Sequence, residues 1–188
     1  MSEKYQIIYA DPPWKFNNKN TGGSLKSGAD AHYPTMTLDS ICTLDIKKIA
    51  DENCALFMWW VGSMPIEALT VVDAWGFTLK TMTGFTWVKL TKNQKLAFGM
   101  GFWTRQGSEN CLIAVRGNIK RIDAGIRNVI IEEDTGFYIN EAHSKKPPIF
   151  RERITELMGD IPRVELFARE RFEGWHAWGN EVNSDIKI

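Results

Sequence analysis

The chain has 188 residues, of which 44% are hydrophobic and 24% charged; this fits one globular domain with a buried core and excludes an intrinsically disordered protein. Lys and Arg total 23, and Asp and Glu also total 23, so the zero net charge argues against a purely electrostatic nucleic-acid binder. All apolar runs are short, which argues against a membrane span and a signal peptide. The three cysteines and three histidines are scattered, which argues against a disulfide framework and a zinc site, so we expect a cytoplasmic protein.

The first half of the chain alternates between strand and helix patterns. Tyr5–Ala10 is a short apolar run that predicts a strand, ended by the two prolines that follow it. Residues 15–36 are rich in Asn, Gly, Ser and Lys and predict a long functional loop. A helix is expected to begin at Thr37-Leu38-Asp39 and to carry apolar positions as far as Ile49. Ala55–Val61 is typical of a buried parallel strand, and Pro65–Trp75 of a helix.

The second half continues the same alternation. Thr78–Leu90 and Asn110–Val115 indicate strands on either side of a second polar, Gly-rich loop at residues 91–108. After a stretch without a clear pattern, Pro147–Met158 predicts a helix and Val164–Ala168 a final strand. The alternation predicts an α/β fold with a mixed, mainly parallel sheet and helices on both faces. In such sheets ligands bind at the carboxyl ends of the strands.

The segment Asp11-Pro12-Pro13-Trp14 directly follows the first predicted strand. Two prolines make a rigid turn, so the Asp11 carboxylate and the Pro12 carbonyl can each accept one hydrogen from a planar amine while Trp14 stacks on its ring. Acceptors on both hydrogens favour a localised lone pair on the nitrogen and stabilise the positive charge that develops there. The alternative is a proline-terminated strand with an incidental carboxylate and a core tryptophan. The chain contains neither GxGxxG nor a P-loop sequence.

The charges are unevenly distributed along the chain. Residues 80–127 carry nine basic and two acidic side chains, a net charge of +7, whereas the segments before and after carry −3 and −4. Such a basic segment can face phosphates, and the alternative is an ordinary solvated surface.

Recognition of a family rests on five segments in order along the chain. DPPW after a hydrophobic strand resembles the signature of MT-A70-type methyltransferases, which methylate adenine N6 with S-adenosylmethionine. The other four segments also resemble this family and are Asp30–Met36 (DAHYPTM), Gly101–Gly117 (GFWTRQGSENCLIAVRG), His143–Pro147 (HSKKP) and Val164–Glu181 (VELFARERFEGWHAWGNE). The resemblance covers most of the chain. It implies a Rossmann-like methyltransferase fold in the permuted β-class order, because the cofactor motif follows the catalytic motif.

The resemblance also implies roles for individual residues. Catalysis is expected at Asp11, Pro12, Pro13 and Trp14. Contacts with S-adenosylmethionine are expected at Asp11, His143, Ser144, Lys146, Phe167, Arg169, Glu170, Asn180 and Glu181, with Lys146 meeting the methionine carboxylate. Contacts with the nucleic acid are expected at Trp14, Tyr33, Trp103, Glu109, Lys92, Lys95, Lys120 and Arg121. No metal is expected.

Eight tryptophans exceed the roughly two or three of average composition. We expect Trp59, Trp60, Trp75 and Trp87 in the core, because they lie within predicted strands and helices. The other four lie at the base-binding or cofactor motifs, at positions 14, 103, 175 and 178.

Two departures from larger relatives shape the expected function. Ten residues precede DPPW and few follow Glu181, so we expect residues 1–188 to be a single catalytic domain without a separate target-recognition domain, and short or loose sequence specificity. Adenine N6 is hidden inside a duplex, so the base must be flipped or the substrate single-stranded. DNA is the expected polymer, and a homodimer is left open. RNA adenosine, cytosine N4 and a role as a non-catalytic partner subunit remain alternatives.

Overall fold

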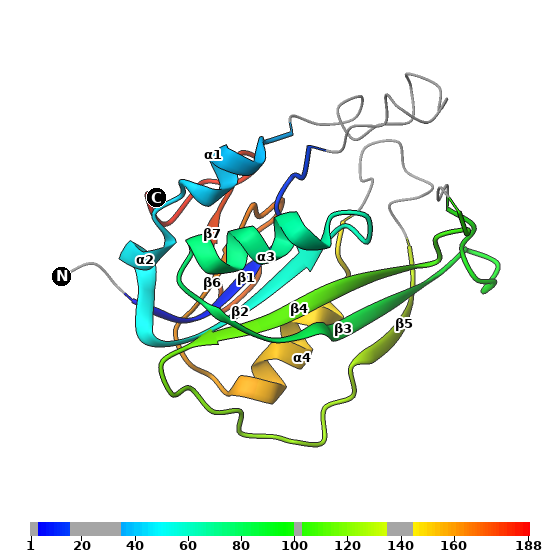
Figure 1. Ribbon diagram of the computed structural model, residues 1–188. Helices are drawn as coiled ribbons and strands as arrows, with labels where there is room; N and C mark the ends of the chain where they lie inside the picture. Colours follow the sequence, from blue (N-terminus) through cyan, green and yellow to red (C-terminus); the bar gives the residue numbers. More distant parts are fainter. Residues whose placement is uncertain (1–3, 16–34, 100–102, 135–144) are drawn as a thin grey trace.

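The computed structural model describes residues 4–15, 35–99, 103–134 and 145–188 (Figure 1). Their strands form one seven-stranded sheet in the order β5-β3-β4-β2-β1-β6-β7. The strands are β1 (Tyr5–Ala10), β2 (Ala50–Trp60), β3 (Thr78–Leu90), β4 (Ser108–Arg116), β5 (Val129–Glu133), β6 (Arg163–Leu166) and β7 (His176–Trp178). Strand β4 is antiparallel to both of its neighbours, and all other pairs are parallel. The predicted mixed, mainly parallel sheet is confirmed.

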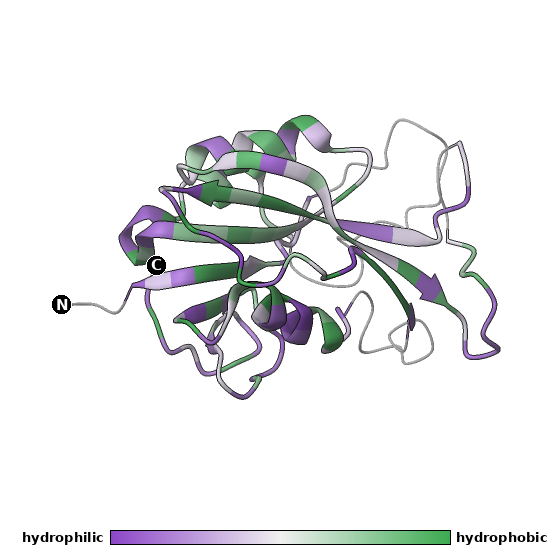
Figure 2. Ribbon diagram, turned by 90° about the horizontal axis from the view of Figure 1, so that it is seen from below, coloured by the Kyte–Doolittle hydropathy of each residue, from purple (hydrophilic) through white to green (hydrophobic). Residues whose placement is uncertain are grey.

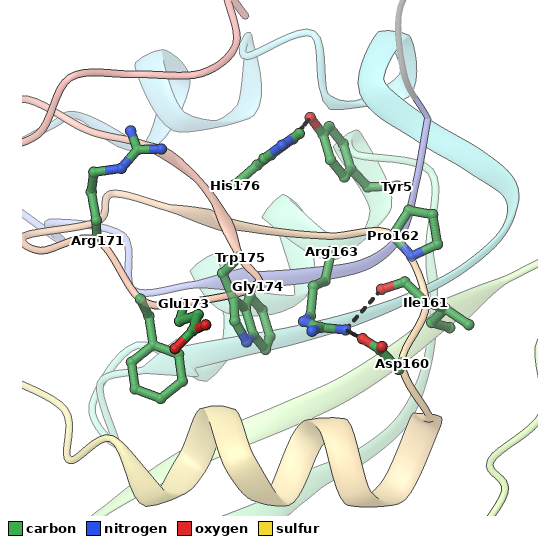
Figure 3. A pocket seen from close by; sticks show the side chains of 11 residues that line it. Tyr5, Asp160, Ile161, Pro162, Arg163, Arg171, Glu173, Gly174, Trp175 and His176 are labelled. Atoms are coloured by element: carbon green, nitrogen blue, oxygen red, sulfur yellow. Dashed lines mark hydrogen bonds and ion pairs between the residues drawn. The ribbon is translucent and has the colours of Figure 1, made fainter.

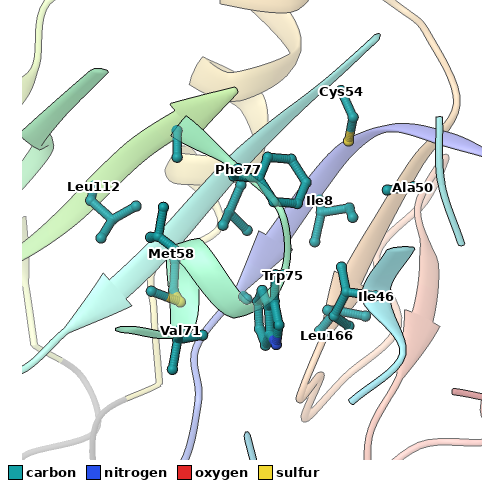
Figure 4. Close-up of a cluster of buried hydrophobic side chains, with 14 of the residues drawn as sticks. Ile8, Ile46, Ala50, Cys54, Met58, Val71, Trp75, Phe77, Leu112 and Leu166 are labelled. Carbon is teal, nitrogen blue, oxygen red and sulfur yellow. The ribbon is translucent and has the colours of Figure 1, made fainter. Parts of the chain in front are cut away.

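Helices cover both faces of this sheet, as the sequence predicts. Helices α1 (Leu38–Cys42), α2 (Ile46–Ile49) and α3 (Pro65–Ala74) lie on one face, and α4 (Ile149–Met158) lies on the other (Figure 1). Two separate clusters of buried side chains fill the two interfaces. Trp75 of the α3 C-terminus packs in the first cluster (Figure 4), and Phe150 of α4 packs in the second. The strands in the middle of the sheet are accordingly largely hydrophobic (Figure 2).

The helix expected from Thr37 is wrong in its extent, because the segment forms two short helices. The Thr37 side chain accepts a hydrogen bond from Ser40 N and begins α1. The Thr43 hydroxyl donates back to the Ser40 carbonyl at 3.1 Å, which competes with helical continuation and ends the helix. Strands β5 and β7 lie where the sequence shows no strand pattern. Strand β5 is an edge strand, and β7 has only three residues.

The topology brings the functional segments to one edge of the sheet. The carboxyl ends of β1, β2, β3, β5 and β6 point the same way, and the amino end of antiparallel β4 joins them. We call this the carboxyl edge. In the part of the chain that the structure describes, no helix is both long and apolar enough to cross a membrane.

Candidate active site

The turn after β1 is held in place on two sides. Pro12 O accepts from Trp14 N at 2.8 Å, and Pro13 O accepts from Met36 N at 2.8 Å. The Trp14 indole is 6% exposed and donates to the Trp59 carbonyl at 3.1 Å. Each carbonyl oxygen has two lone pairs, so Pro12 O can accept one more hydrogen. Trp14 thus anchors the turn to β2, and its stacking on a base stays a prediction.

Five alternating charges start from this turn and run along the carboxyl edge. Asp11 Oδ2 lies 2.7 Å from Lys146 Nζ, which also lies 3.0 Å from Glu109 Oε2. Lys89 Nζ lies 2.6 Å from Glu109 Oε1 and 2.9 Å from Asp134 Oδ2. We call these five residues the charge chain. Three carboxylates and two ammonium groups give it a formal net charge of −1.

The ion pairs keep the centre of the charge chain ionised. Burial alone raises the pKa of Glu109, but Lys146 and Lys89 outweigh burial and lower this pKa to about 2. Burial alone lowers the pKa of Lys146, but Asp11 and Glu109 outweigh it and raise this pKa above its usual range. Burial, with Asp11 as a second cause, raises the pKa of the Cys111 thiol well above its ordinary value. At neutral pH Glu109 is therefore a carboxylate and Lys146 an ammonium group, beside the protonated thiol of Cys111.

The exits of β6 and β7 form a second part of the carboxyl edge. Phe167 follows β6 with φ of 60°, a left-handed conformation that is strained for a bulky side chain. A Cβ added to Gly179 would lie 2.3 Å from Ala168 O, so only glycine fits where the two exits meet. Ala168 N donates to Trp178 O at 2.9 Å. The two segments that the family resemblance assigns to the cofactor are therefore tied together by the backbone.

Charged side chains surround these exits. Arg169 Nε lies 3.6 Å from Glu181 Oε1, and Lys145 Nζ lies 2.7 Å from Glu170 Oε2. Behind them, Arg151 and Glu165 form a buried bidentate ion pair with N–O distances of 2.7 and 2.8 Å. Arg169, Glu170 and Glu181 thus lie together at the carboxyl edge, and their contact with a cofactor remains a prediction.

The structure separates the predicted nucleic-acid contacts. Lys92, Lys95 and Trp103 lie in the connection between β3 and β4, at the carboxyl edge, and Trp103 is 98% exposed. Lys120 and Arg121 follow the other end of β4, about 25–30 Å away along the strand. The basic segment is therefore divided between two edges, and these last two residues are not brought to the site. Predicted contacts that fall outside the described residues are Tyr33, His143 and Ser144.

Sequence reasoning missed the outer half of the charge chain. Lys89 is the penultimate residue of a correctly predicted strand, but in the sequence it stands out only as one of nine basic residues in the basic segment. Asp134 follows β5, whose sequence shows no strand pattern. Because functional side chains are sought at the ends of predicted strands, Asp134 could not be predicted as a site residue.

A cavity of about 620 Å³ opens at the opposite edge of the sheet (Figure 3). Tyr5, Arg163 and His176 lie at the starts of β1, β6 and β7 and help to line it. Arg163 pairs with Asp160 at 2.6 Å, and the Tyr5 hydroxyl lies 2.6 Å from His176 Nδ1. The length of β1 separates this cavity from Asp11, so it is distinct from the candidate active site.

Comparisons with known proteins agree over nearly the whole chain. The family model MT-A70 matches residues 5–181. The chain is similar to the Type II methyltransferase M.MunI of a Mycoplasma species, with 34% identity over 99% of this chain and 81% of that protein. It is also similar to an MT-A70-like N(6)-adenosine-methyltransferase of Arabidopsis thaliana (26% identity, 95% of this chain, 24% of the relative) and to the METTL3 catalytic subunit of Homo sapiens (25%, 96% and 28%). The chain spans about a quarter of these last two relatives.

Proposed function

Since the chain belongs to the MT-A70 family of methyltransferases, we propose that it transfers a methyl group from S-adenosylmethionine to the N6 amino group of adenine in DNA. The position of Asp11, held by Lys146 at the carboxyl edge beside the Pro12 carbonyl, carries the proposal. Short or loose sequence specificity is part of the proposal.

Asp11 and Pro12 supply the acceptors that an adenine amine needs. Asp11 Oδ2 is occupied by Lys146, and within residues 4–15, 35–99, 103–134 and 145–188 the Oδ1 atom has no hydrogen-bond partner. Oδ1 and the second lone pair of Pro12 O can therefore each accept one N6 hydrogen. Positive charge grows on N6 as its lone pair forms the bond to the methyl carbon, and both acceptors stabilise that charge. The carboxylate that holds one hydrogen is also the first acceptor for the proton that N6 must lose.

The residues at the β6 and β7 exits fit the proposed cofactor. S-adenosylmethionine supplies a methyl group activated by its sulfonium when bound. Carboxylates suit its cationic groups and ribose hydroxyls, and the described edge offers Glu170 and Glu181 beside the strand exits. Arg169 is a cation suited to its carboxylate. The close approach that Gly179 allows supports a fixed cofactor cradle.

The choice of DNA rests on the relatives. Identity to the Type II methyltransferase is 34% and extends over 81% of that protein, against 25–26% for the relatives named adenosine methyltransferases. We therefore group this chain with the Type II methyltransferase and propose DNA as its substrate. Methylation of RNA adenosine is the second candidate, favoured by the names of the plant and human relatives.

The test is transfer of labelled methyl groups from S-adenosylmethionine to matched DNA and RNA oligonucleotides, followed by nucleoside analysis of the product. N6-methyladenine in DNA is expected. Asp11→Ala should lower turnover about 100- to 1000-fold, because it removes an acceptor for developing charge, yet leave cofactor affinity measured by calorimetry largely intact. Asp45→Asn removes an exposed carboxylate and is the control. Cofactor binding without transfer to any polymer would refute the proposal, and so would equal loss of affinity and turnover in Asp11→Ala.

A second test concerns the path of the DNA. Replacing Lys92 and Lys95 with Gln should weaken binding and lower the slope of log K against log salt by about 2, if each contacts one phosphate. The pair Lys120 and Arg121, at the opposite edge, should have little effect when neutralised. An unchanged slope after the first double substitution would remove the β3–β4 connection from the binding face.

A further inference from the structure

We infer that Lys89 and Asp134 are positioning residues for methyl transfer, which hold Glu109 and, through it, keep Lys146 on one oxygen of Asp11. The inference rests on the proposed function and adds the outer half of the charge chain to its machinery. Neither residue lies in the five segments that resemble the family. Both act on the reacting amine only through other side chains.

Glu109 has both oxygens engaged, so its rotation is fixed. Oε1 lies 2.6 Å from Lys89 and Oε2 lies 3.0 Å from Lys146. Without Lys89, Glu109 would keep a single ion pair and could turn about its side-chain bonds. Lys146 would then lose a fixed partner opposite Asp11.

Lys89 is itself held from three directions. Its Nζ lies 2.9 Å from Asp134 Oδ2 and 4.5 Å from the centre of the Trp87 ring. The Lys89 side chain is 14% exposed and that of Asp134 is 8% exposed. Asp134 N donates to Leu90 O at 2.9 Å, so the backbones of the neighbouring strands β3 and β5 fix the distance between the pair (Figure 1). The outer end of the charge chain is therefore anchored to the sheet.

The two lysines of the charge chain lie over the faces of buried aromatic rings. Lys146 Nζ lies 5.1 Å from the Trp59 ring centre, as Lys89 lies over Trp87. Both indoles make edge contacts with Phe150 of α4, at 4.8 and 6.3 Å between ring centres. Buried rings on one side reduce screening, so each ion pair is stronger and more strictly oriented than on an open surface.

This arrangement serves the open oxygen of Asp11. As long as Lys146 stays on Oδ2 of Asp11, Oδ1 remains available to the amine. A displacement of a catalytic group by about 1 Å can lower turnover about 100-fold, so the position of the Asp11 carboxylate matters for the rate. The titratable neighbours behind the charge chain, Cys111 and Tyr9, have pKa values raised mainly by burial and stay neutral. The pKa of Glu109 is therefore set chiefly by its burial and by the two lysines, Lys146 and Lys89.

The experiment compares Lys89→Met, Lys89→Arg and Asp134→Asn in the full chain. Lys89→Met should lower kcat about 10- to 100-fold with cofactor affinity near that of the wild type, and Lys89→Arg should restore most of kcat. Carboxyl-carbon NMR should show a higher pKa for Glu109 in Lys89→Met, because a cation that lowers it is gone. Asp134→Asn should lower kcat without raising that pKa, since it removes a negative charge. Lys48→Met, which removes an exposed lysine, is the matched control.

The outcomes separate three cases. Unchanged kcat in Lys89→Met, or lost kcat with an unchanged Glu109 pKa and no rescue by Lys89→Arg, overturns the inference. If Lys89→Met does not fold, the test rests on Asp134→Asn and Lys89→Arg. A lower kcat in Asp134→Asn together with a near-wild-type kcat in Lys89→Arg supports the inference, and any other combination overturns it. If the wild type methylates no polymer, the proposed function fails first, while the NMR titration still tests whether Lys89 controls Glu109.

Discussion

Glu109→Gln is the sharpest test of the electrostatics at the carboxyl edge. The substitution keeps the shape of the side chain but removes the charge between Lys89 and Lys146. The folded-state pKa of Glu109 is about 2, against an ordinary value of 4.5. That difference corresponds to about 3 kcal/mol, reduced to about 2–3 kcal/mol by solvent at a side chain that is 27% exposed. The variant should lose this amount of unfolding free energy at pH 7.

The pH dependence gives the test its sign. A lowered folded-state pKa stabilises the protein fully above the unfolded pKa of 4.5, and this contribution is lost as the pH falls through about 2. Urea unfolding should therefore show a gap of about 2–3 kcal/mol between wild type and variant at pH 7, and of about 1 kcal/mol at pH 3. Glu156→Gln, which breaks an exposed pair with Arg153, should cost less than about 1 kcal/mol. A gap that does not narrow toward low pH would refute the reasoning.

Two further substitutions test the frame around the site. Gly179→Ala should lower the unfolding free energy by about 1–3 kcal/mol and weaken S-adenosylmethionine binding in calorimetry, because the added Cβ would meet Ala168 O. The control is Gly62→Ala, whose added Cβ would have no atom within 4 Å and should change neither quantity. Glu165→Leu should cost about 3–5 kcal/mol in urea unfolding, because it leaves the buried Arg151 with only a longer ion pair to Glu170 at 3.9 Å, and adding Arg151→Met should recover most of the loss. Equal losses in the single and double variants would contradict the pairing.

Local signals explain which elements were predictable. The bounds of β1 and β3 match the predicted strands, because β1 is an apolar run that two prolines end and β3 alternates loosely between apolar and polar residues. Helix α3 begins at the predicted Pro65, and Gly76, with φ of 79°, follows its end. Strand β5 has no such signal. Its apolar side chains Val129 and Ile131 are exposed, so the strand is held mainly by its pairing with β3 and not by burial. Its register, such as Ile130 opposite Trp87, depends on residues far away in the sequence.

The family is likewise predictable from local motifs, whereas the contacts of the site depend on residues far apart in the sequence. The family inferred from five segments is confirmed by a match over residues 5–181. Motifs single out Asp11 and Lys146, but their ion pair joins residues 135 positions apart, and that of Lys89 with Asp134 joins residues 45 apart. Only the sheet order brings them together. The reversal of β4 likewise divides a basic segment that is continuous in sequence.

The tryptophan excess has a structural cause that composition alone does not reveal. Five of the eight are buried, including Trp14 and Trp175, which the sequence placed with the base-binding or cofactor motifs. Four buried indoles each donate a hydrogen bond to a different element: Trp14 to Trp59 O, Trp59 to the Tyr9 hydroxyl, Trp75 to Ile41 O and Trp87 to Glu132 O. An indole thus fills volume and fixes direction at once, which leucine or phenylalanine cannot do. Because Trp59 and Trp87 also lie beneath Lys146 and Lys89, the bonds that orient these rings orient the charge chain above them.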